Sequence, residues 1–207
     1  MLNELIERYP SLKVCKGDIE KAISLLTDCY ERGGKLLLCG NGGSCADCEH
    51  IAGELMKGFM NKRPLSSEQK SEMQGRCDSI SSDTLEKLQN ALPAIPITSF
   101  SALNTAFSND VEPSLIYAQS VLALGKSGDV LLAISTSGNS KNVVEAARVA
   151  KGLGLGVIAL TGVGGGMLAG LADVTIRVPE SETYKVQELH LPVYHYICAA
   201  IEKHFFG

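Results

Sequence analysis

The sequence predicts an α/β protein, a three-layer doubly wound sheet of about five parallel strands flanked by helices. Five short apolar segments have the length of buried strands, at residues 35–39, 94–98, 130–134, 156–160 and 174–178. Stretches with the spacing of amphipathic helices separate most of them, and strands that alternate with helices normally pair in parallel. The 21 glycines suit the many tight turns that such a fold needs.

Length and charge narrow the class of protein further. With 207 residues, 45% of them hydrophobic, the chain can bury a full core, and we expect a single domain over residues 1–207. A net charge of −4 without a dense basic cluster predicts no nucleic-acid partner and no anionic membrane partner. The first ten residues lack the apolar core of a signal peptide, and the longest apolar runs are far shorter than a membrane span of ~20 residues. We therefore expect a cytoplasmic protein.

The helices are expected between and after the strands. Residues 18–32 have an amphipathic pattern that ends at Gly33-Gly34. The remaining expected helices span residues 45–59, 99–109, 113–124, a stretch after residue 140, a brief 167–171 and a long 181–204. Pro192 lies inside the last of these, and we expect it to kink or interrupt the helix.

Residues 61–92 break the alternation of strands and helices. The stretch is rich in Ser, Glu, Gln, Lys and Asp, poor in large apolar residues, and long for a connection. A short helix is expected after Ser82 or Asp83, either of which can cap it. We interpret the stretch as a polar surface insertion that is mobile or serves an interface.

Two turns have the composition of anion-binding sites. The apolar strand at 130–134 opens into Ser135-Thr-Ser-Gly-Asn-Ser140 and then into a helix, so free backbone N–H groups and four hydroxyls face the turn. Gly40-Asn-Gly-Gly-Ser44 follows the strand at 35–39 in the same way. Ligands of such sheets lie beyond the carboxyl ends of the strands, where both turns fall. From the first turn alone, an ordinary Ser-rich turn with a helix cap remains an equal alternative.

Histidines and cysteines supply the other candidate functional groups. His50 and Glu54 are four residues apart and share one helix face, although such a pair is also common on surfaces. His190 and His195 lie in the last helix, where a lone histidine is more often packed or solvated than a ligand. The pair Cys45 and Cys48 permits redox or zinc chemistry. Because the seven cysteines are irregularly spaced, we favour reduced thiols and simple packing.

Taken together, these motifs resemble the sugar isomerase (SIS) family. The resemblance rests on Gly40-Asn-Gly-Gly-Ser44, His50-x-x-x-Glu54, Ile134-Ser-Thr-Ser-Gly-Asn-Ser140, Leu160-Thr-Gly162 and Gln187-Glu-x-His190 with His195. More narrowly, the motifs are similar to those of the phosphoheptose isomerases, which act in heptose biosynthesis for bacterial surface glycans. The similarity covers nearly the whole chain except residues 61–92.

The resemblance implies a function and a set of site residues. The function is aldose–ketose isomerisation of a phosphorylated sugar, sedoheptulose 7-phosphate to glycero-manno-heptose 7-phosphate, through an enediol with Glu54 and His195 as acid and base. The implied zinc ligands are His50, Glu54, Gln187 and His195, and the implied assembly is a homotetramer with sites between subunits. The implied substrate-binding residues are Asn41, Gly42, Ser44, Asn109, Asp110, Ser135, Thr136, Ser137, Ser140 and Gln187.

Spacing adds one expectation about assembly. Gln187 and His195 are eight residues apart, which in a straight helix means a rise of roughly 12 Å and a turn of about 80°. Zinc ligands lie about 2 Å from the ion. We therefore expect one chain to supply Gln187 and another to supply His195.

Three departures from the family pattern keep alternatives open. Gly58 stands where the family commonly has an arginine, Tyr184 stands where it often has an aspartate, and Thr161-Gly-Val-Gly-Gly-Gly166 lacks the usual aspartate of that turn. An isomerase for another sugar phosphate or a sugar-phosphate sensor is therefore an alternative. A further alternative is a non-catalytic adaptor of the kind that associates with a replication initiator.

Overall fold

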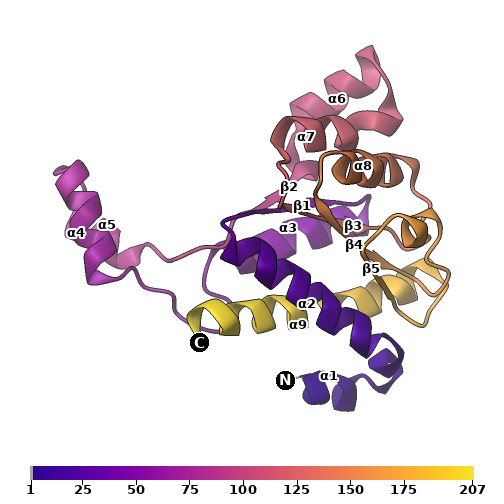
Figure 1. Ribbon diagram of the computed structural model, residues 1–207, viewed down its shortest axis with the longest axis horizontal. Helices are drawn as coiled ribbons and strands as arrows, with labels where there is room; N and C mark the ends of the chain where they lie inside the picture. The colour runs from indigo at the N-terminus through magenta and orange to yellow at the C-terminus, as the bar shows by residue number, and fades with distance from the viewer. Residues whose placement is uncertain (1) are drawn as a thin grey trace.

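The computed structural model describes residues 2–207, and these form a three-layer α/β unit around a parallel sheet (Figure 1). The strand order is β2-β1-β3-β4-β5. β2 and β3 therefore lie on opposite sides of β1, and the topological switch point of the sheet falls between β1 and β3. Both the predicted fold class and the five predicted strands are confirmed. The strands are β1 (Leu36–Cys39), β2 (Ala94–Pro96), β3 (Val130–Ile134), β4 (Gly156–Thr161) and β5 (Val174–Arg177).

Helices cover both faces of the sheet, which explains why the strands are apolar throughout. Side chains alternate between the two faces along each strand. Leu36 and Leu38 pack with α2 (Lys16–Glu31), α3 (Gly43–Met56) and α9 (Thr183–Phe206). Leu37 and Cys39 pack on the other side, with α7 (Ile116–Leu124) and α8 (Lys141–Gly152). The sheet lies between these two cores.

Several helical elements differ from the sequence expectation. We expected a kink or an interruption at Pro192; α9 runs through it, so the interruption is wrong, and Pro192 is buried in the helix. The N-terminal elements α1 (Leu2–Arg8) and η1 (Pro10–Cys15) were not expected. The other elements are α6 (Ser101–Asp110) and the short 3-10 turns η2 (Ile97–Ser99), η3 (Pro113–Leu115) and η4 (Met167–Gly170). Across residues 2–207, every helix is too short or too polar to span a membrane.

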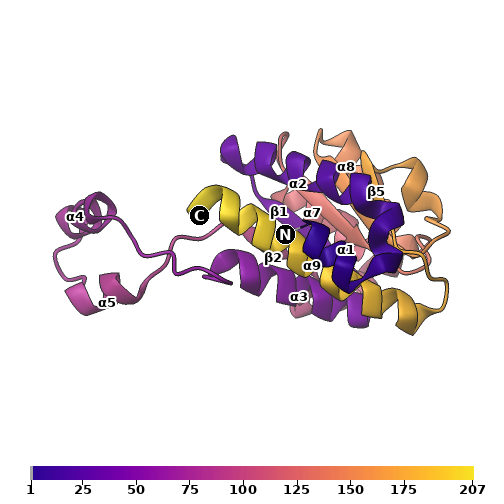
Figure 2. The same ribbon diagram turned by 90° about the horizontal axis from the view of Figure 1, so that it is seen from below.

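The polar insertion forms a helical arm that projects from the body of the molecule (Figures 1 and 2). It contains two helices, α4 (Ser67–Arg76) and α5 (Ser82–Lys87), where the sequence predicted one. α4 begins with a capping box in which Ser66 and Gln69 bond to each other's backbone. α5 is capped by Ser81, so the expected caps Ser82 and Asp83 are wrong by one and two residues.

Candidate active site

The glycine-rich turn after β1 and the hydroxyl-rich turn after β3 lie next to each other. β1 and β3 are neighbours in the sheet, with Cys39 paired to Ala133 at their carboxyl ends. The side-chain amides of Asn41 and Asn142 exchange two hydrogen bonds of 2.9 Å and join the first turn to α8. Neither Asn142 nor its role was expected, because an asparagine at the start of a helix ordinarily indicates only a cap.

The glycine-rich turn is shaped for close approach by a side chain. Gly42 has φ +56°, which favours glycine, and a Cβ on Gly43 would lie 2.5 Å from Nε2 of Gln187. Gln187 therefore lies directly against the turn, although it is 144 positions further along the chain. Ser44 is nearly buried at the start of α3, and its N–H bonds to the carbonyl of Asn41. The structure thus brings together four predicted substrate-binding residues.

The hydroxyl-rich turn is ordered by its own side chains and by the next turn in the sheet. Ser135 and Ser140 are hydrogen-bonded through their hydroxyls at 2.9 Å, and the Ser137 hydroxyl accepts from the N–H of Asn139 at 3.1 Å. The turn at 161–166 supports it, since the N–H of Gly162 donates to the carbonyl of Thr136 at 2.9 Å. All four predicted hydroxyls lie on this one turn, and Ser137 is the most exposed of them.

Asn109 and Asp110 are not brought to these turns. They end α6, and their side chains are exposed and hydrogen-bonded to each other at 2.8 Å. Among residues 2–207, α6 packs mainly on η3 and α7. Their proposed role in lining the pocket therefore requires a contact beyond the single chain.

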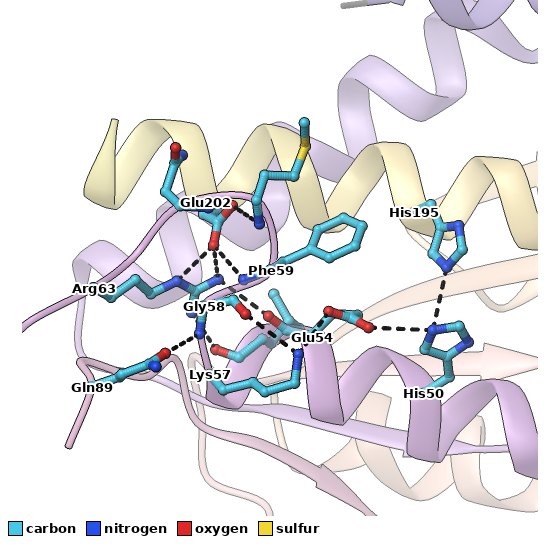
Figure 3. Close-up of polar contacts among 12 residues, drawn as sticks. His50, Glu54, Lys57, Gly58, Phe59, Arg63, Gln89, His195 and Glu202 are labelled. Atoms are coloured by element: carbon cyan, nitrogen blue, oxygen red, sulfur yellow. Dashed lines mark hydrogen bonds and ion pairs between the residues drawn. The ribbon is translucent and has the colours of Figure 1, made fainter. Parts of the chain in front are cut away.

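A second cluster joins α3 to α9 and contains both predicted acid–base residues (Figure 3). Nε2 of His50 lies 3.3 Å from Oε1 of Glu54 and 3.4 Å from Nε2 of His195. Burial lowers the pKa of His195, and the nearby His50 lowers it further, while Glu54 acts in the opposite direction. His195 is therefore neutral at pH 7 and can either accept or donate a proton.

The four predicted zinc ligands are only partly assembled. The separation of 3.4 Å between the imidazole nitrogens of His50 and His195 is close to that of two ligands about 2 Å from one tetrahedral ion. Gln187, however, lies at the glycine-rich turn, roughly 12 Å of helix rise away from His195. Within residues 2–207, no group of three or more His, Cys, Asp or Glu is arranged to hold a metal ion. A single chain therefore presents only part of the predicted set of zinc ligands.

The turns and the acid–base cluster lie at opposite ends of α3. Ser44 and Glu54 are ten residues apart on this helix, which corresponds to about 15 Å of rise. The two parts of the candidate site are therefore separated along this helix within one chain.

A buried ion pair, which sequence reasoning missed, fixes the end of α3 next to Glu54 (Figure 3). The side chains of Arg63 and Glu202 are fully buried and lie 2.8 Å apart. The guanidinium also donates to the carbonyls of Leu55 at 2.7 Å and Glu54 at 3.1 Å. The only sequence signal was a glutamate in the apolar run of α9, Cys198-Ala-Ala-Ile-Glu202.

The same region explains why Gly58 replaces the family arginine. A Cβ on Gly58 would clash with the backbone oxygen of Asn61, so a side chain cannot be accommodated here without a shift of the backbone. The N–H of Gly58 donates to Oε1 of Gln89 at 2.6 Å. This hydrogen bond connects the segment that follows the helical arm to the turn after α3. Lys57 is the nearest cation, with its Nζ 3.3 Å from Oε2 of Glu54.

An open cleft of about 490 Å³ adjoins His195. It is lined from α1, from Phe59 and Met60 after α3, and from α9. The ring of Phe59 lies 5.7 Å from that of His195, centroid to centroid. Of the acid–base cluster, His195 lines this cleft.

The remaining candidates are structural. His190 is fully buried, and burial lowers its pKa to about 4. Cys48 is buried in the core, and burial raises the pKa of its thiol well above the usual value. Both outcomes agree with the packing role expected for these residue types.

Comparison with known proteins agrees with this architecture. The SIS domain family matches residues 4–95 and 89–162. A phosphoheptose isomerase from Shewanella loihica is 39% identical over 191 residues, which cover 91% of this chain and 84% of that protein. The solved structure of the phosphoheptose isomerase from Neisseria gonorrhoeae is 33% identical in sequence and has a TM-score of 0.76. The match covers 97% of this chain and 94% of the chain from Neisseria gonorrhoeae. The one from Francisella tularensis is 31% identical with a TM-score of 0.74, covering 98% of both chains. The chain belongs to the SIS domain family, and relatives that share nearly its whole length are phosphoheptose isomerases.

Proposed function

We propose that the protein is an aldose–ketose isomerase of a phosphorylated sugar, with sedoheptulose 7-phosphate as the substrate. The observation that carries the proposal is the cluster of Glu54 and His195 around His50, placed beside an open cleft. The relatives named phosphoheptose isomerase support the choice of sugar.

The chemistry requires a base at carbon and a group that moves protons at oxygen. Glu54, whose side chain is only 14% exposed, would remove the proton from the carbon next to the carbonyl to form the enediol. His195, neutral at pH 7, would exchange the proton between the two oxygens. Glu54 would then return its proton to the neighbouring carbon, so the enzyme ends the cycle as it began.

The separation along α3 supports a shared site in a homotetramer. A sugar whose phosphate is held by the turns of one chain would present its reacting carbons to the cluster of another. Zinc stays a prediction in this arrangement, with His50 and His195 from one chain and Gln187 from a second. The cluster itself is intrachain, because His50 contacts both Glu54 and His195 of its own chain.

Mixing experiments can test the shared site. Ser137→Asp would repel the phosphate, and Glu54→Gln would remove the base, so each variant alone should be inactive. After dissociation and reassembly together, some sites would combine an intact turn with an intact cluster, and activity should return. Glu54→Gln mixed with His195→Ala should not recover, because each chain then carries a damaged cluster. Recovery in the second mixture and not in the first would contradict this arrangement.

The reaction itself is tested by incubating the protein with a panel of sugar phosphates and following ketose–aldose exchange by NMR. We expect exchange with sedoheptulose 7-phosphate and none with Glu54→Gln under the same conditions. Exchange with a different sugar would correct the substrate. Binding without exchange for the whole panel would favour a sensor over an enzyme.

A further inference from the structure

A buried tyrosine and a carboxylate lie behind the acid–base cluster and have no part in the chemistry described so far. Tyr194 precedes His195 on α9 and is only 2% exposed. Its hydroxyl lies 3.1 Å from Oδ1 of Asp47 and 3.1 Å from Nδ1 of His50. Asp47 is one turn before His50 on α3, so the three side chains form a continuous chain of hydrogen bonds across the two helices.

The direction of these hydrogen bonds follows from the groups themselves. An ionised carboxylate only accepts, so the hydroxyl of Tyr194 donates to Asp47. The tyrosine oxygen can then only accept from His50, which requires a hydrogen on Nδ1 of that ring. In neutral His50, Nε2 therefore carries the lone pair, and this is the atom that faces Glu54 and His195.

We infer that Tyr194 and Asp47 are positioning residues that hold His50 in its Nδ1–H tautomer. The inference rests on the proposed isomerase function for its catalytic consequence. With the lone pair on Nε2, His50 accepts the Nε2–H of His195 and donates nothing to Glu54. In the opposite tautomer, Nε2–H would donate to the Glu54 carboxylate, stabilise it and weaken it as a base.

The aromatic packing allows the hydroxyl to be tested separately from the ring. The Tyr194 ring packs edge-on against His50 and His195, at centroid distances of 5.5 and 5.0 Å. Tyr194→Phe keeps these contacts and removes only the hydroxyl. Tyr30→Phe is a matched control, because Tyr30 is also buried and its hydroxyl donates to the carbonyl of Pro93, away from the cluster.

The direct test is the tautomer of His50, observed by long-range ¹H–¹⁵N NMR of the imidazole rings. The chain has four histidines, and a His50→Gln variant assigns the signal. We expect Nδ1–H in the parent and in Tyr30→Phe, and a loss of this preference in Tyr194→Phe. Asp47→Asn should shift His50 toward Nε2–H, because an amide can donate to the tyrosine oxygen and reverse the chain.

Kinetics provide the second readout. In Tyr194→Phe we expect kcat to fall on the order of 10–100-fold with little change in KM, as for other residues that orient a functional histidine. A parent His50 in the Nε2–H form, or a Tyr194→Phe variant that matches Tyr30→Phe in both tautomer and kcat, would overturn the inference. The NMR result does not require turnover, so a parent inactive on every sugar phosphate would refute the proposed function and leave the tautomer assignment standing.

Discussion

Removing the charge of Arg63 should destabilise the protein far more than removing a surface charge. Arg63→Met leaves the carboxylate of Glu202 in a fully buried position without its counter-ion. It also removes the donors to the carbonyls of Glu54 and Leu55 at the end of α3. Breaking a buried ion pair in this way costs about 3–5 kcal/mol of unfolding free energy.

Glu202 makes this site unusually dependent on its arginine. Its carboxylate also accepts the N–H groups of Phe59, Met60 and Asn61, at 2.8, 2.7 and 3.1 Å. Burial opposes ionisation, but the N–H groups of Phe59 and Met60 and the Arg63 guanidinium outweigh it and hold the pKa of Glu202 below its usual value. Without Arg63, only the three N–H groups are left to offset the burial of the carboxylate.

Urea unfolding at pH 7 measures the effect, with the concentration of protein held constant because an oligomer dissociates as it unfolds. Lys87→Met is the control, since Lys87 pairs with Asp83 on the exposed surface of α5 and such pairs contribute little. The double variant Arg63→Met/Glu202→Gln removes both charges and keeps an acceptor for the three N–H groups. It should recover part of the loss, and the double-mutant cycle then gives the coupling energy.

The reasoning would be refuted by a small effect. If Arg63→Met and Lys87→Met lower the unfolding free energy by the same amount, the pair is not desolvated as described. If the loss in the double variant equals the sum of the losses in Arg63→Met and Glu202→Gln, the two charges do not depend on each other. A large loss with partial recovery is the expected result.

Two further variants test the site, and a third tests the stability effect of a buried histidine. Glu54→Gln should nearly abolish turnover while substrate binding persists, as measured by kcat and by calorimetry; near-parental kcat would exclude Glu54 as the base. Ser137→Ala should weaken sugar-phosphate binding by about 1–2 kcal/mol through loss of one donor, and an unchanged affinity would exclude a phosphate role for this serine. His190 has a folded-state pKa of about 4, below its usual 6.5, so the unfolded chain binds the proton first as the pH falls. Stability present above pH 6.5 should therefore be lost between pH 6.5 and 4, by roughly 3 kcal/mol, and His190→Leu should lack that pH-dependent loss.

The fold could be predicted from the sequence because its local signals agree with one another. The buried strand at Val130–Ile134 was predicted to the residue, since it is apolar throughout and ends abruptly at Ser135. β2 was predicted two residues too long, because Ile97 and Thr98 continue the β-type composition while the chain turns into a 3-10 helix at Ile97. The motifs also placed both turns and the acid–base cluster on the elements where they are found.

The contacts between distant segments could not be predicted in this way. Nothing in local composition links Arg63, in a polar stretch, to Glu202 in the last helix, because burial of both charges depends on how α3 packs on α9. The hydrogen bond between Tyr194 and His50 could not be predicted either, because an aromatic residue in an apolar helix indicates only core packing. At Pro192 the sequence allowed an interruption of the helix, but α9 continues through this buried residue.

The neck of the helical arm has a consequence for how this chain can vary. Pro64 and Gln89 face each other in an antiparallel bridge, and the N–H of Asn90 donates to the carbonyl of Arg63 at 2.7 Å. The chain therefore leaves the body and returns to it at one point. Arg63, before the arm, is hydrogen-bonded to Glu202, and Gln89, after the arm, is hydrogen-bonded to Gly58. The entropy of closing a loop grows only slowly with its length. The arm is thus a module whose size and sequence can be exchanged, for a tight turn or for an inserted tag, while the register of β2 and the end of α3 stay where they are.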